Sequence, residues 1–85
     1  MKVLYFAWLR ERVGTGEEEV SPPPEITSVS ALMDWLAKRS AGHARAFENR
    51  DIVRAAVNQE FADPADAVSP GDEVAFFPPM TGGRP

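Results

Sequence analysis

An apolar and aromatic run extends from Lys2 to Trp8 near the start of the chain and predicts a β-strand. Arg10-Glu11-Arg12-Val13 predict a short helical turn, which ends at the segment Gly14-Thr15-Gly16. Residues 17–21 are expected to return as a second strand that forms a hairpin with the first. Pro22-Pro23-Pro24 follow, and because proline cannot donate to a strand ladder, they predict an extended loop.

The clearest helical pattern runs from Val29 to Arg39. Apolar residues recur there at i, i+3, i+4 and i+7, which places them on one stripe that faces a sheet. Ser28 or Thr27 offers the oxygen of an N-cap, and Gly42 is the expected C′ residue beyond the last turn. The stripe consists of Val29, Leu32, Met33 and Leu36.

The second half of the chain contains two further strand patterns. Residues 44–48 predict one more turn of helix, and Ile52–Val57 predicts a short strand that ends at the turn Asn58-Gln59. Proline and glycine breaks follow at 63–64 and 69–72, with a single helical turn expected at 65–68. Glu73–Phe77 is the last strand, and Pro78-Pro79 stop it.

This order of strand, strand, helix, strand, strand predicts an α+β domain. A mixed sheet of four to five strands, crossed by one main helix and with the first and last strands at its centre, is the β-grasp arrangement. The 85 residues leave room for only one such domain. We expect it to occupy residues 1–79, and we expect residues 80–85 to form a flexible C-terminal tail.

Both faces of the predicted sheet carry large apolar side chains. Side chains alternate along the last strand, so that Phe76 points to one face and Phe77 to the other. One helix covers only one face, and two interpretations of the second face follow. Either loops cover it, or Phe6, Phe61 and Phe77 form an exposed patch for a permanent partner.

Composition and charge exclude several kinds of function. The chain has no cysteine, which excludes disulfides, thiolate metal sites and a cysteine nucleophile. Its net charge of −4 has the wrong sign for a nucleic-acid partner. No signal-peptide pattern is present, and no apolar run approaches the roughly 20 residues that span a bilayer. We therefore expect a cytoplasmic protein without a nucleic-acid or membrane partner, and its small size favours a carrier or subunit over an enzyme.

The isolated polar residues form no catalytic motif. His43 is the single histidine, and its place near the predicted helix end indicates a surface or capping role. The carboxylate pairs Asp63/Asp66 and Asp72/Glu73 flank proline or glycine breaks. We expect them to be solvated turn residues and not an acid–base or cation site.

The strongest candidate chemistry lies at the C-terminus. Pro78-Pro79 stiffen the chain as it leaves the sheet. Gly82-Gly83 then lack a Cβ and can pass through a channel too narrow for other residues. A Gly-Gly pair is by itself a weak signal, because most such pairs near a chain end belong to frayed termini.

The segment PGDEVAFFPPMTGG at residues 70–83 resembles the C-terminal signature of the MoaD family, the small sulfur-carrying subunits of molybdopterin synthase. The similarity extends over nearly the whole chain. Residues 3–7 look like the family's opening strand, and residues 55–59 look like its middle strand and turn. A thiamine-pathway sulfur carrier is a near relative, but the PPMTGG ending and Phe76-Phe77 fit it less well.

The resemblance implies a ubiquitin-like fold and a role in molybdenum cofactor biosynthesis. In the family, an ATP-using activating enzyme adenylates the terminal glycine carboxylate, which Gly83 matches here, and a sulfurtransferase system converts it to a thiocarboxylate. The tail, including Gly82, then enters the large synthase subunit, which supplies the catalytic residues. The sulfur passes to cyclic pyranopterin monophosphate. The carrier is expected to bind no cofactor and to be no enzyme on its own.

The resemblance also predicts the residues that touch the large subunit. Phe6, Phe61 and Phe77 match positions that pack against it in the family, which favours an exposed patch over coverage by loops. The remaining residues of the predicted interface are Pro78, Pro79, Met80 and Thr81.

The chain departs from the family pattern where Arg84-Pro85 follow Gly83. While these two residues remain, Gly83 is held in an amide and has no carboxylate to activate. We expect a protease to trim them; the alternatives are a cloning remnant or a binding module that never transfers sulfur. A ubiquitin-like modifier that is joined through Gly83 to target lysines is a further alternative, because it would use the same fold and tail.

Overall fold

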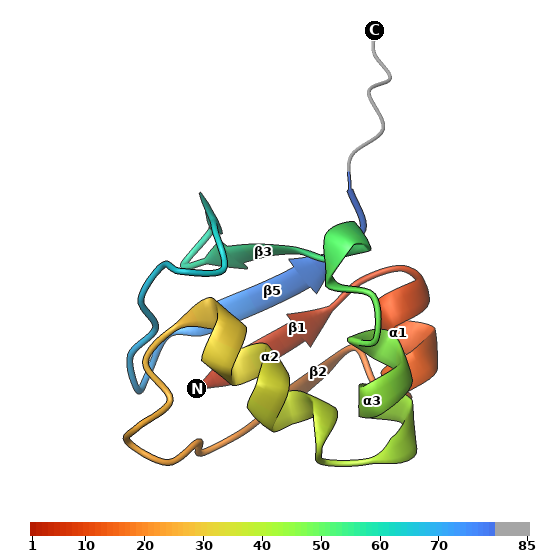
Figure 1. Cartoon of the computed structure of the whole chain (residues 1–85), viewed down its shortest axis with the longest axis horizontal. Helices are drawn as coiled ribbons and strands as arrows, with labels where there is room; N and C mark the ends of the chain where they lie inside the picture. The colour runs from red at the N-terminus through yellow and green to blue at the C-terminus, as the bar shows by residue number, and fades with distance from the viewer. Residues whose placement is uncertain (80–85) are drawn as a thin grey trace, which may run out of the picture.

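The computed structural model describes residues 1–79, which form a five-stranded sheet in the order β2-β1-β5-β3-β4 (Figure 1). β1 (Lys2–Tyr5) and β5 (Glu73–Phe77) are parallel neighbours, and all other pairs are antiparallel. The first and last strands are therefore inside the sheet, as predicted. The predictions for Met80, Thr81, Gly82, Gly83 and Arg84-Pro85 lie outside the described residues.

The first strand is shorter than its apolar run predicted. β1 ends at Tyr5, and the helix α1 (Trp8–Val13) begins three residues later, so the predicted strand through Trp8 was wrong. Ala7 between them has φ 56° and ψ −133°, and this backbone turn ends the strand. α1 stops at Gly14, which takes the left-handed conformation with φ 99° and donates its N–H to the carbonyl of Arg10. β2 (Glu17–Glu19) then pairs with β1.

The main helix, α2 (Val29–Ala37), follows the loop that contains the three prolines. The Ser28 hydroxyl caps it by accepting the N–H of Ala31 at 3.1 Å. All four residues of the predicted apolar stripe are buried. The helix ends two residues before Arg39, and the expected C′ role of Gly42 was wrong.

Gly42 lies inside a second helix, α3 (Ala41–Ala46), which starts earlier than the helical turn predicted at 44–48. The hydroxyl of Ser40 caps α3 by accepting the N–H of His43. A Cβ on Gly42 would overlap the carbonyl oxygen of Arg12, because α3 packs closely on the end of α1. Within residues 1–79, no helix combines the length and the apolar character that crossing a bilayer requires.

The middle of the chain contains one strand that the pattern did not reveal. A 3-10 turn (Arg50–Ile52) precedes β3 (Arg54–Val57), which therefore begins two residues later than predicted. Asn58 and Gln59, both with positive φ, form the predicted turn into β4 (Glu60–Ala62). The helical turn predicted at 65–68 was wrong, because Ala67 forms a β-bridge with Ser28 instead.

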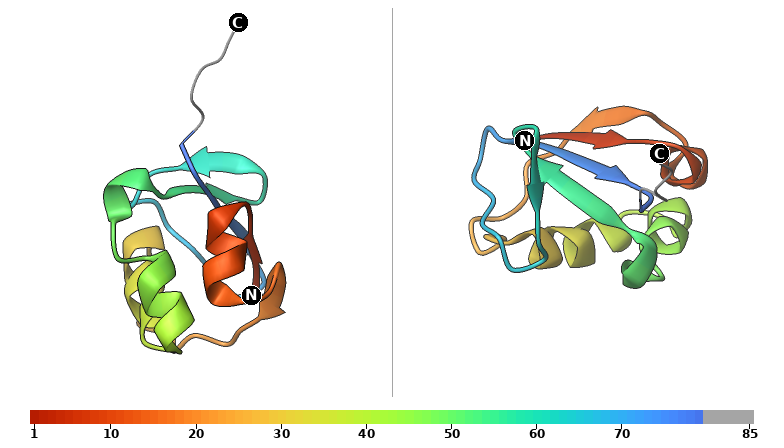
Figure 2. Two further views of the ribbon diagram at one scale, coloured as in Figure 1. Left: turned by 90° about the vertical axis from the view of Figure 1, so that its right-hand side faces the viewer. Right: turned by 90° about the horizontal axis from the view of Figure 1, so that it is seen from above.

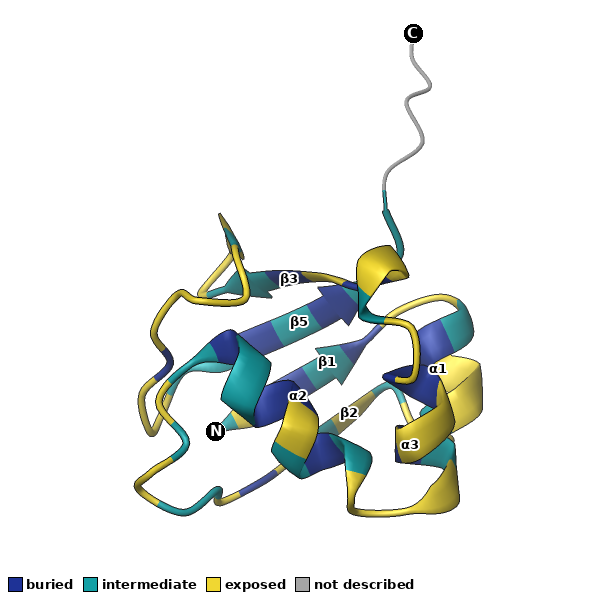
Figure 3. Cartoon of the chain, viewed as in Figure 1, coloured by how far each residue is buried: buried dark blue, intermediate teal, exposed yellow. Residues whose placement is uncertain are grey.

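The core lies on the side of the sheet that α2 and α3 cover (Figures 2 and 3). Val3, Tyr5, Val74 and Phe76 point to that side and are at most 1% exposed. The intervening residues of β1 and β5 point to the opposite face and are only partly buried. The other large buried side chains are Leu9, Val29, Leu32, Leu36 and Phe47.

Candidate functional site

The candidate site is the end of the sheet from which the tail departs. β5 runs to Phe77, which pairs with Arg54 of β3, and Pro78 and Pro79 then lead the chain away from the strands (Figure 1). Neither proline has an N–H to continue the ladder. The tail therefore starts at the end of a strand that is paired on both sides, which fixes its root.

An exposed aromatic pair lies at this root. Phe61 of β4 and Phe77 of β5 have ring centroids 6.0 Å apart at an angle of 50°. Phe61 is 82% exposed, and Phe77 is partly buried. Loops thus do not cover Phe61, and an aromatic ring so exposed is typical of a surface that a partner covers. We call Phe61, Phe77 and Pro79 the aromatic patch.

Phe6 directly follows β1, the strand that pairs with β5. Its N–H donates to the carbonyl of Phe76 at 3.1 Å, which extends the pairing of β1 with β5 by one residue. Its side chain is 47% exposed and, in the part of the chain that the structure describes, is in ring contact with neither Phe61 nor Phe77. The structure therefore brings two of the three predicted phenylalanines together, and the contact of all three with a partner stays a prediction.

A hollow of about 530 Å³ adjoins the aromatic patch. Among residues 1–79, its charged lining residues are Arg54 and Asp63, and no serine, threonine, cysteine, lysine or histidine lines it. Arg54 was not predicted as a site residue from the sequence. Alternation was the signal that could have found it, because Val53 and Ala55 are buried and Arg54 must point the other way. The other lining residues are Ala55, Phe61, Ala62, Phe77 and Pro79.

A group of polar side chains lies on the opposite, helix-covered side, between β1, β2 and α3. Glu18 Oε2 accepts the hydroxyl of Tyr5 at 2.6 Å and lies 2.8 Å from Nε2 of His43. Nδ1 of His43 lies 2.7 Å from the Ser40 hydroxyl, and Arg39 approaches the other Glu18 oxygen at 3.7 Å. We call these five residues the Glu18 cluster.

His43 is therefore no surface residue, and this part of the prediction was wrong. It is 7% exposed, because α3 packs its inner face on the sheet and both ring nitrogens find partners there. The ring also meets Tyr5 edge-on, with centroids 6.0 Å apart. The cluster joins elements of the core, which indicates a structural role.

The environment in the Glu18 cluster shifts the pKa values of Tyr5 and Glu18. Burial, followed by the hydrogen bond to Glu18 and its charge, raises the pKa of Tyr5 far above its ordinary value, so the phenol stays a neutral donor. Burial alone would raise the pKa of Glu18. The hydrogen bonds from Tyr5 and His43, together with the charges of His43 and Arg39, outweigh burial and hold the pKa of Glu18 below its ordinary value.

The carboxylate pairs that flank the breaks serve turns, as predicted. Asp66 accepts the N–H of Asp63 at 2.8 Å, and Asp72 accepts the N–H of Ser69 at 2.8 Å and the side-chain amide of Asn58 at 3.1 Å. Across residues 1–79, no three potential metal ligands come together.

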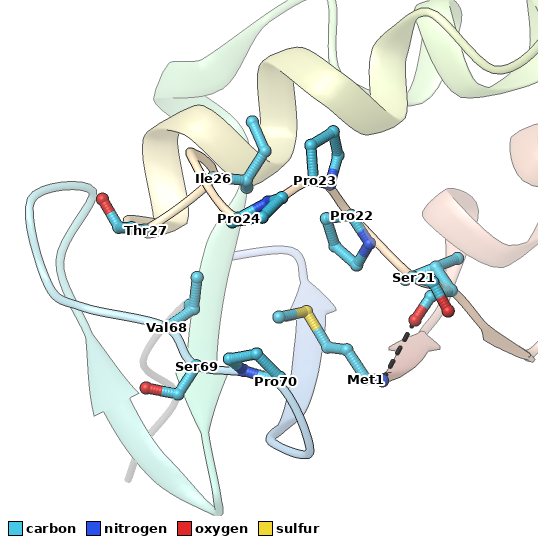
Figure 4. A pocket seen from close by; sticks show the side chains of 11 residues that line it. Met1, Ser21, Pro22, Pro23, Pro24, Ile26, Thr27, Val68, Ser69 and Pro70 are labelled. Carbon is cyan, nitrogen blue, oxygen red and sulfur yellow. Dashed lines mark hydrogen bonds between the residues drawn. The ribbon is translucent and has the colours of Figure 1, made fainter.

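A second hollow, of about 290 Å³, lies between the proline loop and residues 68–70 (Figure 4). The Met1 side chain borders it, and the Met1 ammonium donates to the carbonyl of Val20 at 3.0 Å. Among residues 1–79, no acidic or basic side chain lines this hollow, and it lies where β1 begins, at the opposite end of the sheet from Phe77. It offers no group for acid–base chemistry.

The sequence pattern of the ThiS family matches residues 3–83, nearly the whole chain. The chain belongs to the ThiS family. Among its relatives, the molybdopterin synthase sulfur carrier subunit of Escherichia coli (strain K12) is 45% identical over 83 residues, which cover 98% of this chain and 99% of that protein. The MoaD resemblance inferred from the tail is thereby confirmed.

Solved structures share the fold of this ThiS-family chain. A putative molybdopterin converting factor, subunit 1, from Pyrococcus furiosus superimposes with a TM-score of 0.76 at 33% identity, over 93% of this chain and 95% of that one. SAMP1 from Haloferax volcanii gives a TM-score of 0.72 at 30% identity, over 98% of both chains. The predicted ubiquitin-like β-grasp fold is confirmed.

Proposed function

We propose that this chain is the sulfur carrier subunit of a molybdopterin synthase and acts in molybdenum cofactor biosynthesis. One structural observation carries the proposal. The central strand β5 delivers the chain at the end of the sheet, beside the exposed Phe61–Phe77 pair, directly before the PPMTGG segment. A carrier needs this combination, because its partner must hold the folded domain while it receives the tail.

The chemistry of the proposal is divided between the chain and its partners. A carboxylate is a poor acyl donor, and adenylation of Gly83 with ATP by an activating enzyme gives it AMP as a leaving group. A sulfurtransferase system then supplies the sulfur that makes the thiocarboxylate. Because the chain has no cysteine, its C-terminus is the remaining place for this sulfur. The thiocarboxylate is a soft nucleophile that donates sulfur to cyclic pyranopterin monophosphate.

The catalytic residues belong, in this proposal, to the large synthase subunit. The small chain is then a sulfur-donating subunit that binds no cofactor, is no enzyme by itself and works in the cytoplasm. The hollow beside the aromatic patch supports this division, since no hydroxyl, thiol, amine or imidazole group of residues 1–79 lines it. The exposed ring of Phe61 supports a partner there, because buried aromatic anchors dominate the free energy of many interfaces.

Two shortened chains test the role of Gly83. A chain that ends at Gly83 should support molybdopterin formation with the large subunit, the activating enzyme, ATP and a sulfur source, and it should need no protease. A chain that ends at Gly82 should not, although its residues 1–79 are unchanged. Equal thermal unfolding of the two chains is the control. Equal product from both would overturn the proposal.

The mass of the protein from its own host tests the processing of Arg84-Pro85. We expect chains that end at Gly83, part of them heavier by about 16 Da because sulfur replaces oxygen. A mass that ends at Pro85 in every molecule would favour a binding module that never transfers sulfur, and it would remove the trimming protease from the scheme.

A ubiquitin-like protein modifier is the second candidate, and the likeness to SAMP1, a small archaeal modifier protein, favours it. The same tail would then be joined through Gly83 to lysines of other proteins. Covalent conjugates isolated from the host under denaturing conditions would establish this activity. Their absence, together with the thiocarboxylate mass, leaves the sulfur carrier.

A further inference from the structure

The face of the sheet opposite α2 and α3 is apolar in its middle and charged at its ends. Side chains directly opposite on paired strands share a face. At the end where β1 and β5 begin, Lys2 lies opposite Glu73; at the end where β5 finishes, Phe77 lies opposite Arg54. The apolar strip between them consists of Leu4, Ala75, Ala56 and Phe61, and it ends at Glu17 of β2, which lies opposite Leu4.

Arg54 holds its guanidinium at the tail end of this face. Nη1 donates to the carbonyl oxygens of Asp51 at 2.9 Å and Val53 at 3.3 Å. The side chain is exposed, and no carboxylate of residues 1–79 lies within 4.0 Å of its nitrogens. The carboxylate of Asp63 also lies beyond 4.0 Å from these nitrogens, although Asp63 lines the same hollow. The charge therefore has an anchored position and no acidic partner within the described domain.

We infer that Arg54 binds a carboxylate of the partner that receives the tail, which rests on the proposed function. The planar guanidinium has paired N–H groups that match the two oxygens of a carboxylate. Arg54 borders Phe77 and Pro79 at the rim of the aromatic patch. Charges at an interface rim mainly steer association and fix orientation.

The net charge of the chain shows why this contact selects an orientation. At −4 the whole chain suits a partner with a basic surface. A basic surface repels Arg54 unless one of its acidic side chains faces the guanidinium. The partner can therefore dock closely only when that acid lies next to the root of the tail.

The length of chain between Pro79 and Gly83 distinguishes a protein carboxylate from the phosphate of a nucleotide as the ligand of Arg54. Gly83 is four residues beyond Pro79, and four extended residues span up to about 13–14 Å. A nucleotide joined to Gly83 can be held up to that distance from Pro79, whereas Arg54 lines the hollow beside Pro79. We therefore assign Arg54 to a protein carboxylate.

Association of the full chain with the purified large synthase subunit tests this assignment, at about 0.02 M and about 0.3 M salt. Arg54→Met keeps much of the side chain but removes its charge. We expect it to associate about five- to tenfold more slowly at low salt, with a smaller difference at high salt, because screening weakens steering. Arg54→Lys keeps the charge without the planar fork, and its rate should lie between those of Arg54→Met and wild type.

Lys2→Gln is the matched control, because it removes one positive charge from the other end of the same face. Its association rate should lie within about twofold of the wild-type rate. Unfolding curves of all variants separate lost binding from lost structure, and Arg54→Lys keeps the test valid if Arg54→Met folds poorly.

Three results of this measurement would overturn the assignment: Arg54→Met associates as fast as wild type, its association rate falls no more than that of Lys2→Gln, or the rate falls equally at both salt concentrations. A loss seen only with the activating enzyme and ATP would identify a phosphate as the ligand and would also overturn it. Failure of the proposed function looks different, since the wild-type chain would then not bind the large subunit at all.

Discussion

Gly42 packs closely against another element although it lies in a short surface helix. A Cβ at this position would overlap the carbonyl oxygen of Arg12, at the end of α1. Backbone cannot move aside as a flexible side chain can. Glycine is therefore required here by the approach of α3 to α1 and not by its own φ angle.

Gly42→Ala should lower the free energy of unfolding by about 2 kcal/mol or more. The sign of this change is diagnostic, because in a helix without this contact a glycine-to-alanine substitution would raise the free energy of unfolding by about 1 kcal/mol. Gly16→Ala is the control, since its Cβ would meet only the flexible side chain of Arg10 at 3.2 Å. Urea unfolding measures both variants. A Gly42→Ala protein as stable as wild type would contradict the packing of α3 on α1.

Single residues were predicted well where their own neighbours in sequence decide their environment. The Ser28 cap and the turn residues Asp66 and Asp72 are of this kind. His43 was not predicted, because the groups that bury it come from β1 and β2, far away in sequence. The residues adjacent to His43 in the sequence do not indicate Glu18 as its partner.

At the scale of elements, the start of α2 depends on one hydroxyl. Ser28 accepts the N–H of Ala31, and the backbone of Ser28 also bridges to Ala67. The side chain and the backbone thus have separate tasks, and the serine hydroxyl can be removed without loss of the bridge.

Ser28→Ala should therefore lower stability by about 1 kcal/mol, the usual effect of a lost N-cap. Ser30→Ala is the matched control, because Ser30 lies within the same helix, and its change should stay within about 0.5 kcal/mol. Thermal unfolding followed by circular dichroism compares the two. If the two variants unfold alike, the cap contributes nothing.

Elements with a long regular pattern were predicted, and short ones set by tertiary contacts were not. The apolar stripe of α2 and the run of β5 are regular over several residues. β4 has three residues, too few for alternation to show, and residues 65–68 are held by the bridge to Ser28. The turn at Ala7, with its positive φ, shortens β1 and has no signature in an apolar run.

At the scale of the whole molecule, the Glu18 cluster connects the sheet to the helical layer. Glu18 belongs to β2, Tyr5 to β1 and His43 to α3. Because the pKa of Glu18 is lower in the folded chain than its ordinary 4.5, the ionised carboxylate stabilises the fold above that pH. This contribution is lost as the pH falls through the lower, folded pKa.

Glu18→Gln should consequently lower the free energy of unfolding at pH 7, by about 1 kcal/mol for a disturbed, partly buried hydrogen-bond group. Its stability should also fall less steeply than that of wild type between about pH 5 and pH 3. Glu48→Gln, an exposed change, controls for the loss of one charge at pH 7. Parallel pH profiles for wild type and Glu18→Gln would contradict the role of the cluster.

The sequence predicted the architecture of the whole molecule, and the MoaD resemblance predicted the phenylalanines around the tail. It did not predict the arrangement of charge on the open face. Arg54 becomes notable only when the register places it opposite Phe77, and register is a property of paired strands.

The central place of β5 also has a consequence for biosynthesis. β5 is the only strand that links the β1–β2 pair to the β3–β4 pair, and it supplies Val74 and Phe76 to the core. A nascent chain that still holds β5 in the ribosome therefore has two unconnected strand pairs and an open interior. Because β5 must leave the ribosome before it can pair, and Gly82-Gly83 follow Phe77 by only a few residues, folding is completed only after the glycines have been made. A partner that recognises the finished sheet consequently ignores carriers whose synthesis is incomplete.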